Sequence, residues 1–295
     1  MDNYLIIRKM KVSEASMETS PVTRGFPSIP ALMGFVHALQ RKLQTNHPGI
    51  GFASAGISCH SFDPGLHSTG EGLKISMSRN PPHEKKHLEK GVPFIEEGKA
   101  DMVVSLIIGI EKGEFESRGL ISNTTELLPS MRFSGGTIWG TEQIRTVSCS
   151  KDDDAGQRMV LRQLMPGFVL QERKDLVERS MDEGLDALDA LLDHLEVSRV
   201  ESDETHQKAE WAKKSGEPGW LVPVSVGYHA LSAPGKVANQ RDPDFEHCFA
   251  ENVLTLGEFV MPIRLDRVEQ VLWQPKTDDT QGLYLYTQNF QNKGD

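Results

Sequence analysis

The chain has 295 residues, with 42 acidic and 32 basic side chains and a formal net charge of −10. This length allows one large domain or two smaller ones around a substantial core. Three widely separated cysteines, Cys59, Cys149 and Cys248, exclude both a disulfide framework and a zinc knuckle and fit a reducing cytoplasm. The N-terminal apolar run is too short for a signal peptide, and no run reaches the roughly 18 residues that cross a bilayer. We therefore expect a cytoplasmic protein without membrane contact.

The acidity is concentrated in one segment. Residues 175–210 contain twelve Asp or Glu and three Lys or Arg, a net charge of −9, so the rest of the chain carries only −1. Residues 24–90 have the opposite balance, with eight Lys or Arg against four Asp or Glu. Such a basic patch can bind phosphate, or its members can be scattered, solvated charges. We expect the acidic segment on the outer surface.

The first half of the chain predicts a regular alternation of elements. Residues 4–12 predict a strand, in which Met10 and Val12 alternate with basic residues. An amphipathic helix over 28–45 follows, then a strand over 50–62 and a weaker strand over 73–77 that can pair back as a hairpin. This order, β-α-β-β, fits the first half of a ferredoxin-like fold.

The same fold can be completed by about residue 150. Residues 79–93 are polar, basic and broken by proline, which predicts a mobile loop or hairpin excursion. The apolar run 102–110 predicts a buried central strand, followed by a helix over 119–131 and a strand over 132–138. We therefore expect an α+β, ferredoxin-like β-α-β-β-α-β core over 1–150 with an inserted loop, and a C-terminal extension over 151–295.

The second half is less regular. Its predicted elements are a short helix at 158–165, a strand at 168–170, a long acidic helix at 173–196, a surface linker at 198–217, an extended segment from 218, a helix at 263–272 and a strand at 283–286. None of them shows an internal repeat. We expect this half to be the irregular part of the fold.

The stretch 19–45 is a candidate anion site. Three prolines stiffen the segment before the helix, Ser28 can cap the helix, and Arg24 lies beside the cap in sequence. A rigid loop that ends at a helix N-terminus favours an anion. His37 and Arg41 fall on the polar face of the helix. The alternative is an ordinary first core helix with a capped entry.

Gly135 and Gly136 allow two interpretations. They can form a β-bulge or tight turn, or they can let a ligand backbone approach closely, which a side chain would prevent. Arg132 and Trp139 flank the pair and offer a phosphate donor and a stacking surface. Both interpretations remain open from the sequence.

Catalytic motifs are missing from the sequence. It contains no nucleophile elbow, P-loop, Rossmann fingerprint or zinc-protease helix. His83 and His87 are four residues apart but have no third ligand, so we interpret them as surface residues. His37 and His60 are the histidines nearest to predicted core elements. Either could act as a general base, or could be a polar side chain at a sheet edge or interface.

Several blocks in order resemble one family. They are Ser20-Pro21, Gly25-Phe26-Pro27, Gly34 to Arg41, Met131-Arg132 through Gly135-Gly136, Leu164 to Phe168, Pro218 to Tyr228, and Asn252 with Leu256-Gly257-Glu258. Together they span nearly the whole chain. On these blocks the sequence resembles the Csy-two family of type I-F CRISPR surveillance complexes, which are Cas-five-type RAMP proteins.

This resemblance implies a role and a site. Such proteins are non-catalytic Cascade subunits with an RRM-type RAMP fold, and they hold the 5′ handle of the guide RNA (crRNA). They pair with the large, Cas-eight-type subunit, abut a Cas-seven-type backbone subunit through a thumb, and meet target DNA through the assembled complex. The resemblance suggests residues 79–93 as the thumb or a DNA-facing arm. The expected RNA-facing residues are Arg24, His37, Arg41, Arg132, Ser134, Gly135, Gly136, Trp139, Asn239 and Arg241.

Two alternatives belong to other functional classes. Cas-five-type proteins of other CRISPR subtypes are metal-independent endoribonucleases that process the precursor guide RNA, and here His37 or His60 could be the base. The third possibility is a scaffold that binds only proteins. Neither requires a cofactor or a metal.

Overall fold

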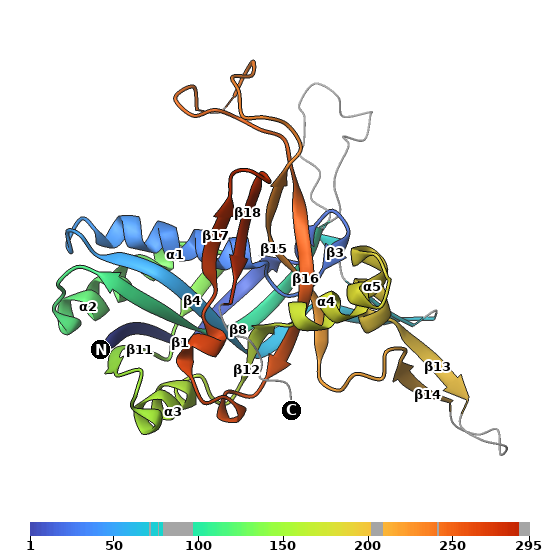
Figure 1. Cartoon of the computed structure of the whole chain (residues 1–295). Coiled ribbons are helices and arrows are strands. Elements are labelled where there is room, and N and C mark those ends of the chain that lie inside the picture. Colours follow the sequence, from blue (N-terminus) through green and yellow to red (C-terminus); the bar gives the residue numbers. More distant parts are fainter. Residues whose placement is uncertain (71, 76, 79–96, 202–208, 241, 289–295) are drawn as a thin grey trace, which may run out of the picture.

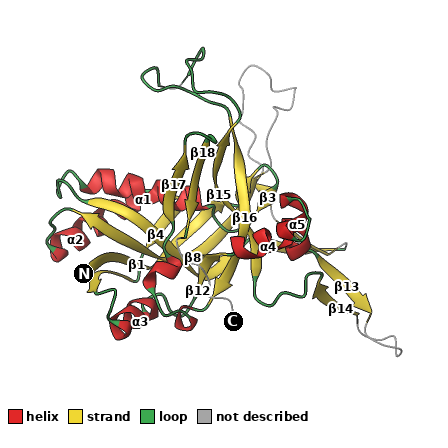
Figure 2. Cartoon of the chain, viewed as in Figure 1, coloured by secondary structure: helices red, strands yellow, loops and turns green. Residues whose placement is uncertain are grey.

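The computed structural model describes residues 1–70, 72–75, 77–78, 97–201, 209–240 and 242–288. It is a mixed α/β structure of mainly antiparallel strands, in which a curled sheet is flanked by a few helices (Figure 1). Figure 2 shows how far the strands outweigh the helices. Within these residues, no helix is long and apolar enough to cross a membrane.

The strands are β1 (Asp2–Ser16), β2 (Glu18–Ser20), β3 (Thr23–Arg24), β4 (Gly51–Asp63), β5 (Leu66–Thr69), β6 (Gly72–Ile75), β7 (Met77–Ser78), β8 (Glu97–Lys112), β9 (Arg132–Phe133), β10 (Gly136–Gly140), β11 (Gln143–Cys149), β12 (Phe168–Glu172), β13 (Val197–Glu201), β14 (Ala209–Lys213), β15 (Leu221–Ala230), β16 (Ala250–Val260), β17 (Gln274–Asp278) and β18 (Leu283–Thr287). The α-helices are α1 (Ile29–Leu43), α2 (Ser117–Leu127), α3 (Asp154–Arg162), α4 (Lys174–Asp182) and α5 (Ala187–Leu195). The described residues also form the short 3-10 helices η1 (Leu128–Ser130), η2 (Pro262–Arg264) and η3 (Val268–Val271).

The main sheet runs through the whole molecule. Its strand order is β17-β18-β15-β16-β12-β4-β8-β1-β10-β9, with β11 also pairing with β1 and β7 with β8. Strand β12 lies between β16 and β4 and joins the C-terminal strands to the N-terminal ones. The two predicted domains therefore share one sheet, and the boundary at residue 150 stays a prediction.

The two faces of β1 lie in different hydrophobic clusters. Leu5 and Ile7 pack in the cluster that α1 and α2 cover, whereas Tyr4 and Ile6 pack in the cluster that α3, η2 and η3 cover. This alternation follows from the two-residue period of a strand. The sheet is therefore covered on both faces near the start of β1.

Helix α1 forms because its sequence combines a cap with an apolar stripe. The Ser28 hydroxyl accepts a hydrogen bond from the Ala31 amide, and Pro30 occupies the first turn, where no amide partner is needed. The buried side chains of α1 are Ile29, Leu32, Met33, Phe35, Val36, Leu39 and Leu43. They close one face of the sheet, as the sequence predicts.

Two bulges in β1 change which side chains face the core. Lys9 and Glu14 have positive φ angles of 44° and 56°, and the pairing register with β8 shifts at both places. Each extra residue reverses the alternation of the strand. Met10 and Val12 therefore enter the α1-side core, and Lys11 lies exposed on the opposite face.

Several predicted elements are confirmed. The predicted strands at 4–12, 50–62, 102–110, 168–170 and 283–286 lie within β1, β4, β8, β12 and β18, apart from one residue at the start of β4. The predicted helices at 28–45, 119–131 and 158–165 correspond to α1, α2 and α3. The prediction of one strand at 132–138 is wrong in part, because Ser134-Gly135 form a turn and the segment is a hairpin of β9 and β10.

Three predictions for the second half are wrong. The helix predicted at 173–196 is two helices, since Gly184 (φ 106°) ends α4 and Asp186 caps α5. The helix predicted at 263–272 consists of η2 and η3. The linker predicted at 198–217 contains parts of the paired strands β13 and β14. The loop predicted at 79–93, including His83 and His87, lies outside the described residues.

Candidate nucleic-acid interface

One part of the second sheet face is left uncovered by the residues that the structure describes. Helix α3, η2 and η3 cover this face around Tyr4, Ile6 and Ile107, but not further along β1 and β8. Since Val12 and Ile138 point into the α1-side core, their neighbours Lys11 and Trp139 point the other way. We call this region the open sheet face and define it by Lys9, Lys11, Val103, Arg132, Thr137 and Trp139.

Trp139 is the most prominent side chain of the open sheet face. The residue is 73% exposed, which is unusual for tryptophan in a folded chain. It lines a hollow of about 320 Å³ together with Lys9, Lys11 and Val103. A flat aromatic surface beside two ammonium groups can stack a base while the ammonium groups contact its phosphates.

Arg132 lies next to the same surface through the β9–β10 hairpin. Arg132 pairs with Thr137 across the hairpin, and its Nη1 donates to Thr137 Oγ1 at 3.1 Å and to the Gly135 carbonyl at 3.3 Å. The guanidinium is exposed and held in place from within the hairpin. Such preorganisation lowers the entropy cost of binding a phosphate.

The turn of this hairpin is Ser134-Gly135. Both residues have positive φ, 47° and 78°, as a two-residue turn between twisted strands requires. The Ser134 carbonyl accepts from the Ser16 amide at 2.8 Å, which fixes the turn to the end of β1. A Cβ built on Gly135 meets nothing within 4 Å, so this residue is open to a ligand.

Gly136 has a packing role. A Cβ at this position would lie 2.7 Å from Val12 Cγ1 and 2.8 Å from both the Ser13 carbonyl oxygen and the Ala15 amide nitrogen. The hairpin therefore approaches the second bulge of β1 closely, which only glycine allows. Of the two glycines, Gly135 is the one that can meet a ligand.

A polar network lies at the covered end of the open sheet face. Ser105 Oγ accepts from the Lys9 amide at 2.9 Å and lies 2.6 Å from His60 Nε2. His60 Nδ1 donates to the Pro166 carbonyl. Burial lowers the pKa of His60, which favours the neutral ring. Both ring nitrogens are engaged within the protein, so the network fixes the first bulge of β1.

Glu142 partly neutralises the cations. Its carboxylate lies 2.6 Å from Lys9 Nζ and 3.8 Å from Arg8 Nη2. The hydrogen bond from Lys9 lowers the pKa of Glu142, so this carboxylate is ionised at neutral pH. A second acid, Asp101, accepts from the Glu14 amide at 2.9 Å. Lys11 and Arg132 are therefore the cations best placed for phosphate.

Arg24 lies near the hairpin turn but is occupied. Its Nε lies 2.9 Å from Glu18 Oε1. The neighbouring Gly25 amide donates to the Met17 carbonyl, one residue after the Ser16–Ser134 contact. The expected anion site at the α1 N-terminus therefore has an arginine whose charge is already paired.

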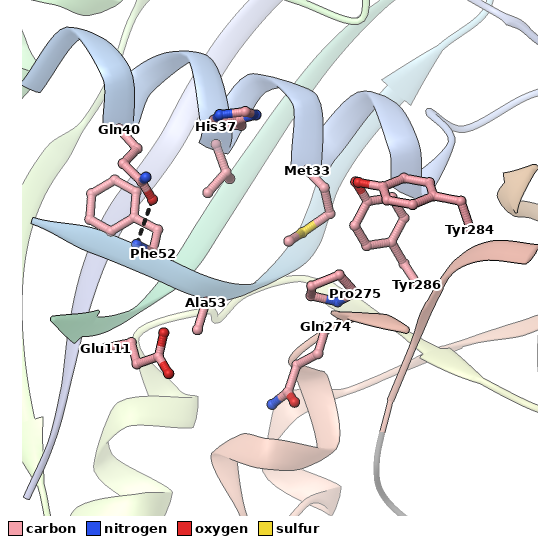
Figure 3. A pocket seen from close by; sticks show the side chains of 11 residues that line it. Met33, His37, Gln40, Phe52, Ala53, Glu111, Gln274, Pro275, Tyr284 and Tyr286 are labelled. Carbon is pink, nitrogen blue, oxygen red and sulfur yellow. Dashed lines mark hydrogen bonds between the residues drawn. The ribbon is translucent and has the colours of Figure 1, made fainter. Parts of the chain in front are cut away.

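His37 and Arg41 lie on the other side of the sheet. Both are exposed on α1, which covers the opposite face. His37 lines a groove of about 460 Å³ between α1, β4 and the β17–β18 hairpin, with Met33, Tyr284 and Tyr286 among its walls (Figure 3). These two residues do not join the open sheet face.

The remaining predicted residues lie elsewhere. Asn239 is exposed in the loop between β15 and β16, which projects from the sheet at the top of Figure 1. Arg241 lies outside the described residues. The structure therefore brings Arg132, Ser134, Gly135, Gly136 and Trp139 together, places Arg24 near their turn but paired with Glu18, and leaves His37, Arg41 and Asn239 apart from them.

Sequence reasoning missed Lys9 and Lys11. In the first strand, basic and apolar residues alternate, and Met10 and Val12 enter the core. This alternation was the sequence pattern that could have identified the two lysines as exposed. Among the described residues, no group of three His, Cys, Asp or Glu side chains could hold a metal ion.

Comparisons with known proteins show which family the chain is similar to. A family profile described as "CRISPR-associated protein (Cas_Csy2)" matches residues 5–286. The chain is 30% identical over 313 residues to CRISPR-associated protein Csy2 of Pseudomonas aeruginosa (strain UCBPP-PA14). That alignment covers 96% of this chain and 94% of the relative.

Proposed function

Since the chain belongs to the Cas_Csy2 family of CRISPR-associated proteins, which serve antiviral defence in type I-F systems, we propose that it is the subunit that holds the 5′ handle of the guide RNA. The open sheet face is the surface that carries out this role. The observation that carries the proposal is the exposed Trp139 beside Lys11 and Arg132. The turn at Ser134-Gly135 lies at the edge of this surface, where a phosphodiester backbone can approach.

The strand order supports a ferredoxin-like core for this surface. Strands β4, β8, β1 and β10 are adjacent in that order, and α1 and α2 contribute to the same core cluster. This is the order expected when a β-α-β-β-α-β unit folds with its first and third strands in the centre. We propose residues 1–150 as that unit and residues 151–295 as an extension that continues the sheet from β12.

The proposed role is non-catalytic. His60, one candidate base, has Ser105 and the Pro166 carbonyl on its two ring nitrogens. His37, the other candidate, lies on the opposite side of the sheet from Trp139. Incubation with repeat RNA in EDTA should therefore leave the RNA intact, and cleavage that His60→Ala abolishes would support the endoribonuclease instead.

The partners follow from the proposed role. They are the crRNA, a large Cas-eight-type subunit, a Cas-seven-type backbone subunit and, through the assembled complex, target DNA in the cytoplasm. Sequence specificity for target DNA would come from pairing by the guide. Residues 231–240 and 242–249, which project from the sheet, and the paired strands β13 and β14 are the described protrusions that can reach neighbouring subunits.

The test is co-purification from cells that express the CRISPR operon, followed by sequencing of the bound RNA. The unmodified chain should retain a mature guide RNA with its repeat-derived 5′ end protected. The double variant K11E/R132E should lose most of it, because phosphate is repelled from the open sheet face. The matched control is K276E on β17, at the opposite end of the sheet order.

Two results would contradict the proposal. Equal retention of guide RNA by K11E/R132E and K276E would show that the open sheet face does not bind the guide RNA. Co-purification of protein subunits without any guide RNA on the unmodified chain would favour a scaffold that binds only proteins.

A further inference from the structure

The helix α5 exposes leucines that a lone surface helix would not need. Leu188 and Leu192 are 62% and 52% exposed, and Leu185, which comes just before the N-cap Asp186, is exposed too. The spacing of four residues places Leu188 and Leu192 on one face of the helix. The opposite face of α5 is already buried, through Ala190, Leu191 and His194. We call Leu185, Leu188 and Leu192 the leucine stripe.

The buried face of α5 explains why the stripe stays outside. Leu191 packs in a cluster with Leu176 of α4, Leu221 of β15 and Leu256 of β16. His194 Nε2 lies 3.0 Å from Ser180 Oγ, which ties α5 to α4. The helix pair is thus already anchored to the sheet, and the stripe contributes nothing to that anchoring. An aligned set of exposed apolar side chains commonly marks an interaction site.

Acidic side chains surround the leucine stripe. Asp182, Glu183 and Asp189 are exposed next to it, and Asp193 and Glu196 follow along the helix. Lys214 pairs with Asp193 and Glu196, each at 3.2 Å. The described residues 174–198 contain eight carboxylates and two cationic side chains, those of Lys174 and Arg179. The rim of the stripe is therefore negative.

This charge pattern selects the occupant. Nucleic acid is excluded, because its phosphates would meet carboxylates. A second copy in a two-fold arrangement is disfavoured, because Asp182, Glu183 and Asp189 would face their own counterparts. A partner protein with an apolar groove and a rim of lysine and arginine would bury the leucines and pair with the carboxylates around them.

From the stripe and its rim, we infer that α5 docks onto another protein subunit of the complex through an apolar groove with a basic rim. This inference rests on the proposed function for the identity of the complex. The guide RNA would occupy the open sheet face, and the protein partner would occupy the leucine stripe. The acidic segment is then an interface and not a solvated surface.

The experiment uses the full chain co-expressed with the other operon subunits and purified through a tag on this chain. The variants are L188E/L192E and the milder L188Q/L192Q, which keeps good helix formers. The matched control is I263E, a side chain 59% exposed on η2. Native mass spectrometry gives the stoichiometry of every subunit, and guide RNA is quantified separately.

Both leucine variants should reduce at least one protein subunit more than tenfold, whereas I263E should retain all of them. The melting temperature of the isolated variants should stay within about 2 °C of the unmodified chain, because the changed side chains are exposed. The charge reversal E183K/D189K should also weaken assembly, and a higher salt concentration should weaken the unmodified complex.

Three results would overturn the inference. They are full retention of all subunits by both leucine variants, the absence of any protein subunit on the unmodified chain, and a leucine effect confined to self-association in analytical ultracentrifugation. The last would identify a second copy as the occupant. If the unmodified complex contains no guide RNA but the leucine variants still lose a protein subunit, that result would contradict the proposed function but not the docking site.

Discussion

Two adjacent glycines in the β9–β10 hairpin have different physical roles. Gly135 needs a positive φ and has open space around it, whereas Gly136 has no room for a Cβ. The sequence alone could not separate these roles, because the residues of β1 that crowd Gly136, Val12 to Ala15, lie more than 120 residues away in the chain. Only pairing between β1 and β10 reveals it.

Gly136→Ala should destabilise the fold more than Gly135→Ala. The new methyl group at 136 would meet backbone atoms at 2.8 Å, and such overpacking costs about 1–3 kcal/mol or more. At 135 the cost is only the strain of a left-handed alanine, about 1 kcal/mol. Urea denaturation measures both. A larger loss for Gly135→Ala would contradict the assignment.

His60 should give the fold a pH dependence. Its pKa is lowered from 6.5 because burial disfavours the charged ring, so below about pH 6.5 the unfolded chain binds a proton that the folded chain does not. Stability is therefore lost as the pH falls below 6.5. The melting temperature should fall more between pH 7 and pH 5 for the unmodified protein than for His60→Gln. Parallel curves for the two proteins would refute this role.

At the scale of the element, the pattern of apolar residues was the reliable signal. Helix α1 was predicted from apolar residues that recur every three to four positions, β1 from alternation with basic residues, and β8 from a near-continuous apolar run. The pair α4–α5 was predicted as one helix, since leucines continue across Gly184 and only its positive φ breaks the helix. Strands β16 and β17 were not predicted, because their pairing partners lie far away in sequence.

The candidate site was partly predictable for the same reason. Arg132 and Trp139 were identified through their neighbouring glycines, which are a local signal. Lys9 and Lys11 were missed because their exposure depends on a bulge whose amide is satisfied by Ser105, almost one hundred residues away. The sequence also did not show which face of the sheet α1 covers. Since α1 covers the face opposite the open sheet face, His37 and Arg41 lie apart from the β9–β10 hairpin.

The connection between β10 and β11 offers a variant that should improve RNA binding. Glu142 holds Lys9 in an exposed ion pair and repels phosphate from the open sheet face. Glu142→Gln should therefore raise the affinity for guide RNA, by about two- to fivefold for a surface charge. The measurement is fluorescence anisotropy at fixed salt, with Glu269→Gln near Lys151 as the control. Unchanged or weaker binding would count against the placement of RNA at Lys9.

At the scale of the whole molecule, the chain separates two charged surfaces. The open sheet face lies among β1, β8 and β10, and the acid-rimmed helices α4 and α5 lie beside β15 and β16. The overall net charge of −10 therefore does not exclude nucleic acid. Each surface can have its own partner.

This separation predicts the salt dependence of RNA binding. If Lys9, Lys11 and Arg132 each neutralise one phosphate, log K against log[salt] should have a slope of about −2, at about −0.7 per contact for a single strand. The variant K11Q/R132Q should make the slope shallower by about 1.4. The control K276Q should leave it unchanged, and a loss of affinity without a change in slope would show that no phosphate contact was removed.

The most direct measurement is ultraviolet crosslinking of the assembled, guide-loaded complex, followed by mass spectrometry of the crosslinked peptides. The account predicts nucleotide adducts on Trp139 or on the β1 peptide that contains Lys9 and Lys11. Adducts confined to other parts of this chain, with Trp139 and β1 unmodified in a fully loaded complex, would contradict it.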